Sequence, residues 1–155
     1  MQKILISACL LGENVRYNAV IKPLIHPILH KWQQEKRLII QCPEVSGGLS
    51  TPREPAEINQ TTGEVITINH IDVTPVFIKG ANNTLSLCKK HNIKYALLKE
   101  SSPSCGSSTL YDGTFTQTKI SGQGVTTQLL EAHNIHVYSE KTIDVLIDII
   151  ATSEL

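Results

Sequence analysis

The sequence predicts a single-domain α/β protein: a mostly parallel, three-layer sheet of the Rossmann-like or flavodoxin-like kind with an inserted β-hairpin. Short apolar runs typical of buried parallel strands alternate along the chain with segments that carry apolar residues at helical spacing. The length of 155 residues suits one domain covering 1–155, and no linker, internal repeat or low-complexity tract interrupts it.

Four apolar runs are expected to form the parallel strands: residues 3–8, 37–41, 95–98 and 135–138. Helices are expected at about 26–36, 74–92, 125–133 and 143–150, so that strands and helices alternate. The second helix should begin with Thr74 as its N-cap and Pro75 at its first helical position. This order predicts right-handed crossovers between parallel strands.

Two segments interrupt the alternation. Residues 56–68 show an apolar pattern with a period of two on both sides of Thr62 and Gly63, which predicts a β-hairpin. Residues 110–124 are rich in turn-forming residues and are expected to form an irregular excursion before the third helix.

Composition narrows the class of partner. Lys and Arg together number 14, as do Asp and Glu, so the formal net charge of zero predicts a small ligand and no general binding of nucleic acid. The apolar stretch after Lys3 is too short for a signal peptide, and no run approaches the ~18 apolar residues of a membrane span. We therefore expect a cytoplasmic protein that is not inserted in a membrane.

Three of the four cysteines follow predicted strands. Cys9, Cys42 and Cys105 each lie at a strand's carboxyl end or within about seven residues of it. Ligands of open parallel sheets bind at this edge, so the three thiols are expected to converge on one crevice. Cys88 shares the apolar stripe of the second predicted helix and is expected to be a small buried hydrophobe.

Three converging thiolates suit either zinc with water as a fourth ligand or a 4Fe-4S cluster with one open iron. A bulky cluster spans three separate strand ends more readily than a single ion does. The alternative is that the cysteines are small residues packed beneath tight loops.

Polar residues beside these cysteines favour chemistry. Glu44, two residues after Cys42, is placed to act as a general acid or base at an open metal position. Ser102 and Ser104 flank Pro103 before Cys105, and their hydroxyls are expected either to orient a polar substrate or to cap the turn.

The nearest cations are Arg16 and Arg53, each expected to bind an anion or to form a solvated pair with Glu13, Glu54 or Glu57. Residues 121–124, which read S-G-Q-G and open a predicted helix, are a weak signal for a phosphate cradle on free backbone amides.

Eight motifs together resemble the domain of unknown function 523 family, in the same order and over nearly the whole chain. They are S-A-C-L-L-G at 7–12, N-x-R-Y at 14–17, C-P-E-V-x-G-G-L-x-T-P-R at 42–53, P-A-E-I at 55–58, D-V-T at 72–74, S-P-S-C-G at 102–106, Y-D-G-T-F at 111–115 and G-x-G-V-T at 122–126. Members of this family include thiouracil desulfidases, which remove sulfur from 2-thiouracil with an oxygen-sensitive 4Fe-4S cluster held by three cysteines.

The resemblance implies that Cys9, Cys42 and Cys105 are cluster ligands and that Glu44 and Ser102 are catalytic. One departure is Val15, which stands where the family often has a further cysteine in N-C-R-Y. The implied activity is non-redox desulfuration of 2-thiouracil or a related thiolated pyrimidine, with thiolated nucleosides and transfer RNA bases left open as substrates. An iron–sulfur electron carrier or sensor and a zinc-binding module are the alternatives.

Overall fold

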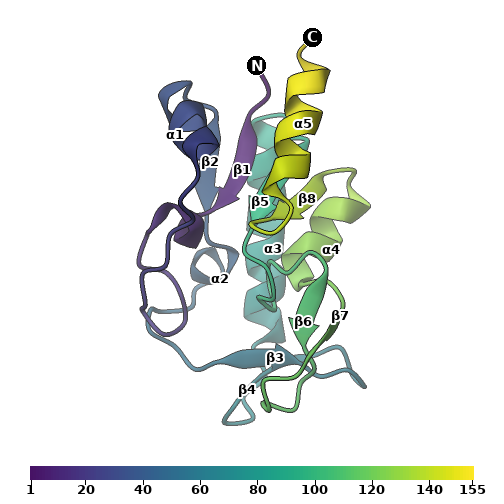
Figure 1. Cartoon of the computed structure of the whole chain (residues 1–155). Helices are drawn as coiled ribbons and strands as arrows, with labels where there is room; N and C mark the ends of the chain where they lie inside the picture. The colour runs from purple at the N-terminus through teal and green to yellow at the C-terminus, as the bar shows by residue number, and fades with distance from the viewer.

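A four-stranded parallel sheet lies at the centre of the computed structural model, which describes all 155 residues (Figure 1). Its strands are β1 (Ile4–Ser7), β2 (Leu38–Gln41), β5 (Tyr95–Leu98) and β8 (His136–Ser139). The strand order is β2-β1-β5-β8, and all three neighbouring pairs run parallel. The predicted parallel α/β fold is confirmed, and all four strands fall within a residue or two of their expected positions.

Helices cover both faces of the sheet and make the three predicted layers. α1 (Pro27–Gln34) and α5 (Ile143–Ser153) pack on one face, and α3 (Thr74–Lys90) and α4 (Val125–Ala132) pack on the other. The alternation of side chains along β1 joins both layers, because Ile4 and Ile6 pack with one pair of helices and Leu5 with the other. None of these helices is both long and apolar enough to cross a membrane.

Two small antiparallel hairpins lie beyond the carboxyl ends of the central strands, at the end of the molecule opposite the two termini (Figure 1). The first, β3 (Ala56–Ile58) with β4 (Val65–Thr67), confirms the predicted hairpin. The second, β6 (Thr109–Tyr111) with β7 (Lys119–Ser121), lies where only an irregular excursion was predicted. Each of these two strands carries one aliphatic residue, Leu110 or Ile120, which is too few to show an alternation in the sequence.

The start of α3 corrects another prediction. The N-cap is Val73, and Thr74 is the first helical residue. The Thr74 hydroxyl instead accepts a hydrogen bond from the backbone N–H of Val65 in β4 at 2.8 Å, while the Asp72 carboxylate accepts the Thr74 N–H at 2.8 Å. The Thr74 hydroxyl, which was expected to cap the helix, therefore forms a tertiary contact with the hairpin.

The strand order brings three connecting segments to one edge. β1 leads into a 3-10 turn at Ala8–Leu11, β2 leads into the short helix α2 (Pro43–Ser46), and β5 leads into a loop that ends at β6. β1 and β5 are neighbours in the sheet although β2 lies between them in the sequence, which makes their carboxyl ends a topological switch point. A crevice for a ligand is expected there.

Candidate active site

The crevice is a cavity of ≈ 530 Å³, and its walls include Cys9, Cys42 and Cys105. The structure thus brings together the three thiols that sequence reasoning placed at strand ends, and Glu44 and Ser102 line the same cavity. Cys88 lies apart from them, fully buried in the core between the sheet, α3 and α4, as predicted.

Cys42 is held by the packing of α2 against α3. It is the N-cap of α2, and Pro43 follows at the first helical position. Gly80 of α3 lies directly beneath, where a Cβ atom would come within 2.0 Å of the Pro43 carbonyl oxygen. Only glycine permits this approach, so α3 sets the position of the segment that carries Cys42 and Glu44.

Cys105 is held by the start of α4. The backbone amides of Gly124, Val125 and Thr126 donate to carbonyl oxygens of the 102–106 turn, with the Gly124 bond reaching Gly106 at 2.8 Å. A Cβ at Gly124 would lie 2.4 Å from the carbonyl carbon of Ser104. The suggested phosphate cradle at 121–124 is therefore wrong: these amides are already used, and they fix the turn that carries Cys105.

Glu44 lies in a short polar network on the cavity wall. Its Oε1 accepts from Arg53 Nε at 3.1 Å, and its Oε2 accepts from the Ser102 hydroxyl at 3.3 Å. The Arg53 and Glu44 side chains are 8% and 15% exposed, so this is a largely buried pair and not the solvated pair with Glu13, Glu54 or Glu57 that was considered. Arg53 Nη1 also donates to Ser50 O and Thr51 Oγ1, which fixes the guanidinium.

Ser102 connects Glu44 to the Cys105 turn. While it donates to Glu44, its oxygen accepts the backbone N–H groups of Ser104 and Cys105, each at 3.1 Å. The hydroxyl therefore caps the turn and also orients the carboxylate. Ser104 itself is buried and exchanges a 2.8 Å hydrogen bond with Thr126, away from the cavity lining.

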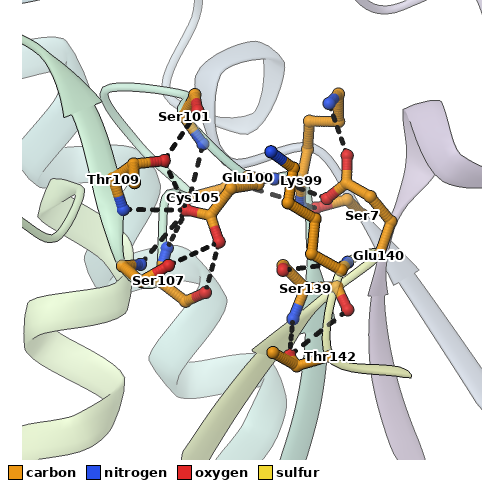
Figure 2. Close-up of polar contacts among 12 residues, drawn as sticks. Ser7, Lys99, Glu100, Ser101, Cys105, Ser107, Thr109, Ser139, Glu140 and Thr142 are labelled. Carbon is orange, nitrogen blue, oxygen red and sulfur yellow. Dashed lines mark hydrogen bonds and ion pairs between the residues drawn. The ribbon is translucent and has the colours of Figure 1, made fainter. Parts of the chain in front are cut away.

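Glu100 is a functional candidate that sequence reasoning missed. This buried carboxylate accepts seven hydrogen bonds from the backbone and hydroxyl groups of the loop that follows it (Figure 2). The donors belong to Ser101, Ser107, Ser108 and Thr109. The signal in the sequence is the cluster of hydroxyl residues after a single acidic one, a pattern that can wrap a loop around a carboxylate.

Burial raises the pKa of all three cavity thiols. The pKa of Cys9 is raised to about 11, first by burial and then by the neighbouring Cys42. The pKa of Cys105 is raised by burial and by Cys42, Glu44 and Cys9, while at Cys42 burial is opposed by the amides of Val45 and Glu44. Neighbouring thiols thus influence one another's pKa. A metal centre that bound there would displace their protons.

The donor set fits a cluster better than a single ion. No three His, Cys, Asp or Glu side chains are arranged as ligands of a single metal ion, and tetrahedral zinc would hold its sulfur ligands about 3.8 Å apart. Ligands of a 4Fe-4S cluster bind different irons and stand farther apart. Three thiols that line one cavity are compatible with that arrangement.

Several basic side chains contribute to the lining of the cavity. Arg16, Lys22, Lys119 and Lys141 line it, and none of them forms a salt bridge. Lys99, a further lining residue, pairs with Glu140. Arg16 was correctly singled out as a cation near the site, whereas the lysines come from β7 and from loops whose direction the sequence does not reveal.

The chain is similar to proteins of one known family over most of its length. Residues 4–142 match the model of the 2-thiouracil desulfurase family. The chain is 42% identical over 149 residues to the uncharacterised protein YbbK of Bacillus subtilis (strain 168), covering 91% of this chain and 97% of YbbK. The solved structure of a 4Fe-4S-dependent thiouracil desulfidase, TudS, is similar at a TM-score of 0.94 and 44% identity, with 100% of both chains covered. The chain therefore belongs to the 2-thiouracil desulfurase family.

Proposed function

We propose that this protein is a 4Fe-4S-dependent desulfidase that replaces the sulfur of 2-thiouracil, or of a related thiolated pyrimidine, by oxygen. The observation that carries the proposal is the meeting of three thiols with the Glu44–Ser102 pair in one cavity. Family membership and the similarity to TudS support the same activity. Cys9, Cys42 and Cys105 are the proposed cluster ligands, and Glu44 and Ser102 are the proposed catalytic residues.

The reaction is a hydrolysis, in which water supplies the oxygen and sulfur leaves as hydrogen sulfide without net electron transfer. The cluster, when bound, supplies a Lewis-acidic iron for the thiocarbonyl sulfur. Glu44 takes one proton from the attacking water and passes it to the departing sulfur, and the second water proton follows as the new C=O bond forms. Arg53 and Ser102 each occupy one oxygen of the carboxylate, which retains lone pairs for the water.

The cavity also favours a substrate larger than the free base. Four basic side chains without salt-bridge partners line it together with the thiols and Glu44. Such cations attract an anionic group such as a phosphate. A thiolated pyrimidine nucleotide is thus a second candidate substrate, which a comparison of kcat/KM with 2-thiouracil tests directly; equal values for the two would remove it.

The main test is anaerobic purification and reconstitution, followed by iron and sulfide analysis and assay with 2-thiouracil. We expect about four irons per chain and release of one sulfide for each uracil formed. Alanine at Cys9, Cys42 or Cys105 should abolish cluster binding. Cys88→Ala is the matched control, because this buried thiol lies in the core outside the cavity.

Each alternative has its own result. A reversible redox signal without sulfide release would identify an electron carrier or sensor. One zinc per chain and no iron would identify a zinc-binding module. Iron binding that persists in all three cysteine variants would refute the proposed ligand set.

A further inference from the structure

We propose that Ser7 is a positioning residue for the desulfidase reaction, whose hydroxyl donates a hydrogen bond to the ligand sulfur of Cys105 and thereby tunes the cluster. The inference rests on the proposed function, because it concerns the electronic state of a proposed ligand. Figure 2 shows the residues involved, drawn from the ends of β1, β5 and β8. No motif in the sequence pointed to this contact, since Ser7 and Cys105 are 98 positions apart.

The contact lies in a buried setting. Ser7 is the last residue of β1, and its exposed fraction is 2%, while Cys105 is 5% exposed. The Ser7 Oγ and Cys105 Sγ atoms are 3.7 Å apart, within the reach of a hydrogen bond to sulfur. Both residues line the cavity, so this bond is made at the wall of the proposed cluster site.

The direction of the hydrogen bond follows from the other partner of Ser7. The backbone N–H of Lys99 donates to Ser7 Oγ at 3.1 Å. A serine hydroxyl has one proton and two acceptor lone pairs, so this bond occupies a lone pair and leaves the proton free. Cys105 Sγ is the acceptor that the proton reaches. A thiolate ligand is a stronger acceptor than a thiol, so the bond strengthens when the sulfur is deprotonated.

The position of the Lys99 amide is itself fixed. The Lys99 ammonium pairs with Glu140, and the neighbouring Glu100 N–H donates to Glu140 Oε1 at 2.7 Å. Glu140 follows the last strand, β8, and so holds the chain at the end of β5 in place. The Lys99 N–H is thereby held in position to donate to Ser7 Oγ, which leaves the Ser7 proton directed toward the sulfur of Cys105.

The chemical consequence concerns the electron density of the ligand. A hydrogen bond to a metal-bound thiolate withdraws charge from the sulfur, which weakens its donation to iron and raises the reduction potential. Less donation leaves the iron a better Lewis acid for a thiocarbonyl sulfur. Ser7 therefore assists the reaction without contact to substrate or participation in proton transfer.

The experiment compares reconstituted wild type, Ser7→Ala and Ser7→Thr by redox titration and by the Fe–S(Cys) stretching frequency in resonance Raman spectra. We expect Ser7→Ala to bind the same amount of iron, with a more negative midpoint potential, a higher Fe–S(Cys) frequency and kcat lower by roughly tenfold at most. Ser7→Thr retains a hydroxyl and should return all three values toward those of the wild type.

Ser139→Ala is the matched control. Ser139 is a fully buried serine at the end of β8, which is separated from β1 by β5, and its hydroxyl accepts from the Lys141 N–H without contacting a cysteine. The midpoint potential and the Raman spectrum of the Ser139→Ala variant should equal those of the wild type. An active, iron-loaded Ser7→Ala protein with unchanged potential and frequency would overturn this inference alone. A wild type that binds no cluster would overturn the proposed function together with it.

Discussion

Two carboxylates beside the proposed ligands differ in how fully their oxygens are occupied. Glu44 follows Cys42 by two residues and Glu100 precedes Cys105 by five, and both line the cavity. Glu44 is bonded only by Arg53 and Ser102, whereas Glu100 accepts seven hydrogen bonds from its own loop. Proximity to the thiols is therefore common to both, and the number of bound donors separates them.

The difference shows which carboxylate is free to move a proton. Burial by itself raises the pKa of Glu100, but hydrogen bonds from the amides of Ser108, Thr109 and Ser101 and from Ser107 lower it from 4.5 to about 2. A carboxylate in this condition stays ionised at neutral pH and has no lone pair left for water. Glu100 thus organises the loop that carries Cys105, and Glu44 is the group available for chemistry.

The largest effect is expected on catalysis, from substitution of Glu44. Glu44→Gln should lower kcat for desulfuration by about 10²–10⁴-fold, because the amide cannot accept the proton of the attacking water. Iron content should stay near the wild-type value, while the midpoint of thermal unfolding should fall because the largely buried Arg53 guanidinium loses its counter-charge. Steady-state assays with 2-thiouracil on the reconstituted variant measure this, and normal turnover would remove Glu44 from the mechanism.

The complementary substitution should act on the fold. Glu100→Gln places an NH₂ group against several N–H and O–H donors and should lower the free energy of unfolding by about 3 kcal/mol. Denaturant titration of the cluster-free protein measures this, with Glu57→Gln as a control carboxylate that accepts only two amides, those of Gly113 and Phe115. An unchanged midpoint for Glu100→Gln would show that the loop does not depend on the carboxylate.

Acid should remove from the wild type the stability that the ionised Glu100 carboxylate contributes. Because the pKa of Glu100 is lower in the folded protein, its contribution to stability is complete above pH 4.5 and is lost as the pH falls toward about 2. The cluster-free wild type should therefore lose stability more steeply across this window than Glu100→Gln. Unfolding curves collected at several pH values measure this difference. The same pH dependence of stability in both proteins would contradict the role assigned to Glu100.

The smallest effect is expected from substitution of Ser102, which connects Glu44 to the Cys105 turn. Ser102→Ala removes one hydrogen bond to Glu44 and the acceptor for two amides of the Cys105 turn. The loss of about 1.4 kcal/mol corresponds to a decrease in kcat of about tenfold. Ser102→Thr, which keeps the hydroxyl, should recover most of the rate. A rate for Ser102→Ala equal to that of Glu44→Gln would mean that Ser102 itself carries the chemistry.

The sequence was sufficient to predict the sheet and the meeting place of the thiols. Buried parallel strands are continuous apolar runs, and residues that follow such runs lie at one edge whatever the loops do. Cys9 and Cys42 follow their strands closely, so their common location required only the strand assignment. The Glu44 and Ser102 roles came from adjacency to cysteines and from family resemblance, and they remain predictions.

The contacts that depend on loop conformation were not predictable. Arg53 binds Glu44 and none of the acidic residues considered for it, because the intervening segment turns the guanidinium back toward α2. Gly124 was interpreted as a ligand cradle, yet its missing side chain makes room for the Ser104 carbonyl group. Such contacts join segments far apart in the chain, and no local periodicity encodes them.

The origin of the three thiols also determines when a cluster can be acquired. Cys9, Cys42 and Cys105 come from the first, second and third strands of the sheet in chain order, so a nascent chain lacks the complete ligand set until about two thirds of it has been synthesised. With these three cysteines as the proposed ligands, the complete set would be available only after β1, β2 and β5 have been made, and a bound cluster would act as a cross-link over that span. Removal of the cluster should then lower the global stability of the protein as well as inactivate it.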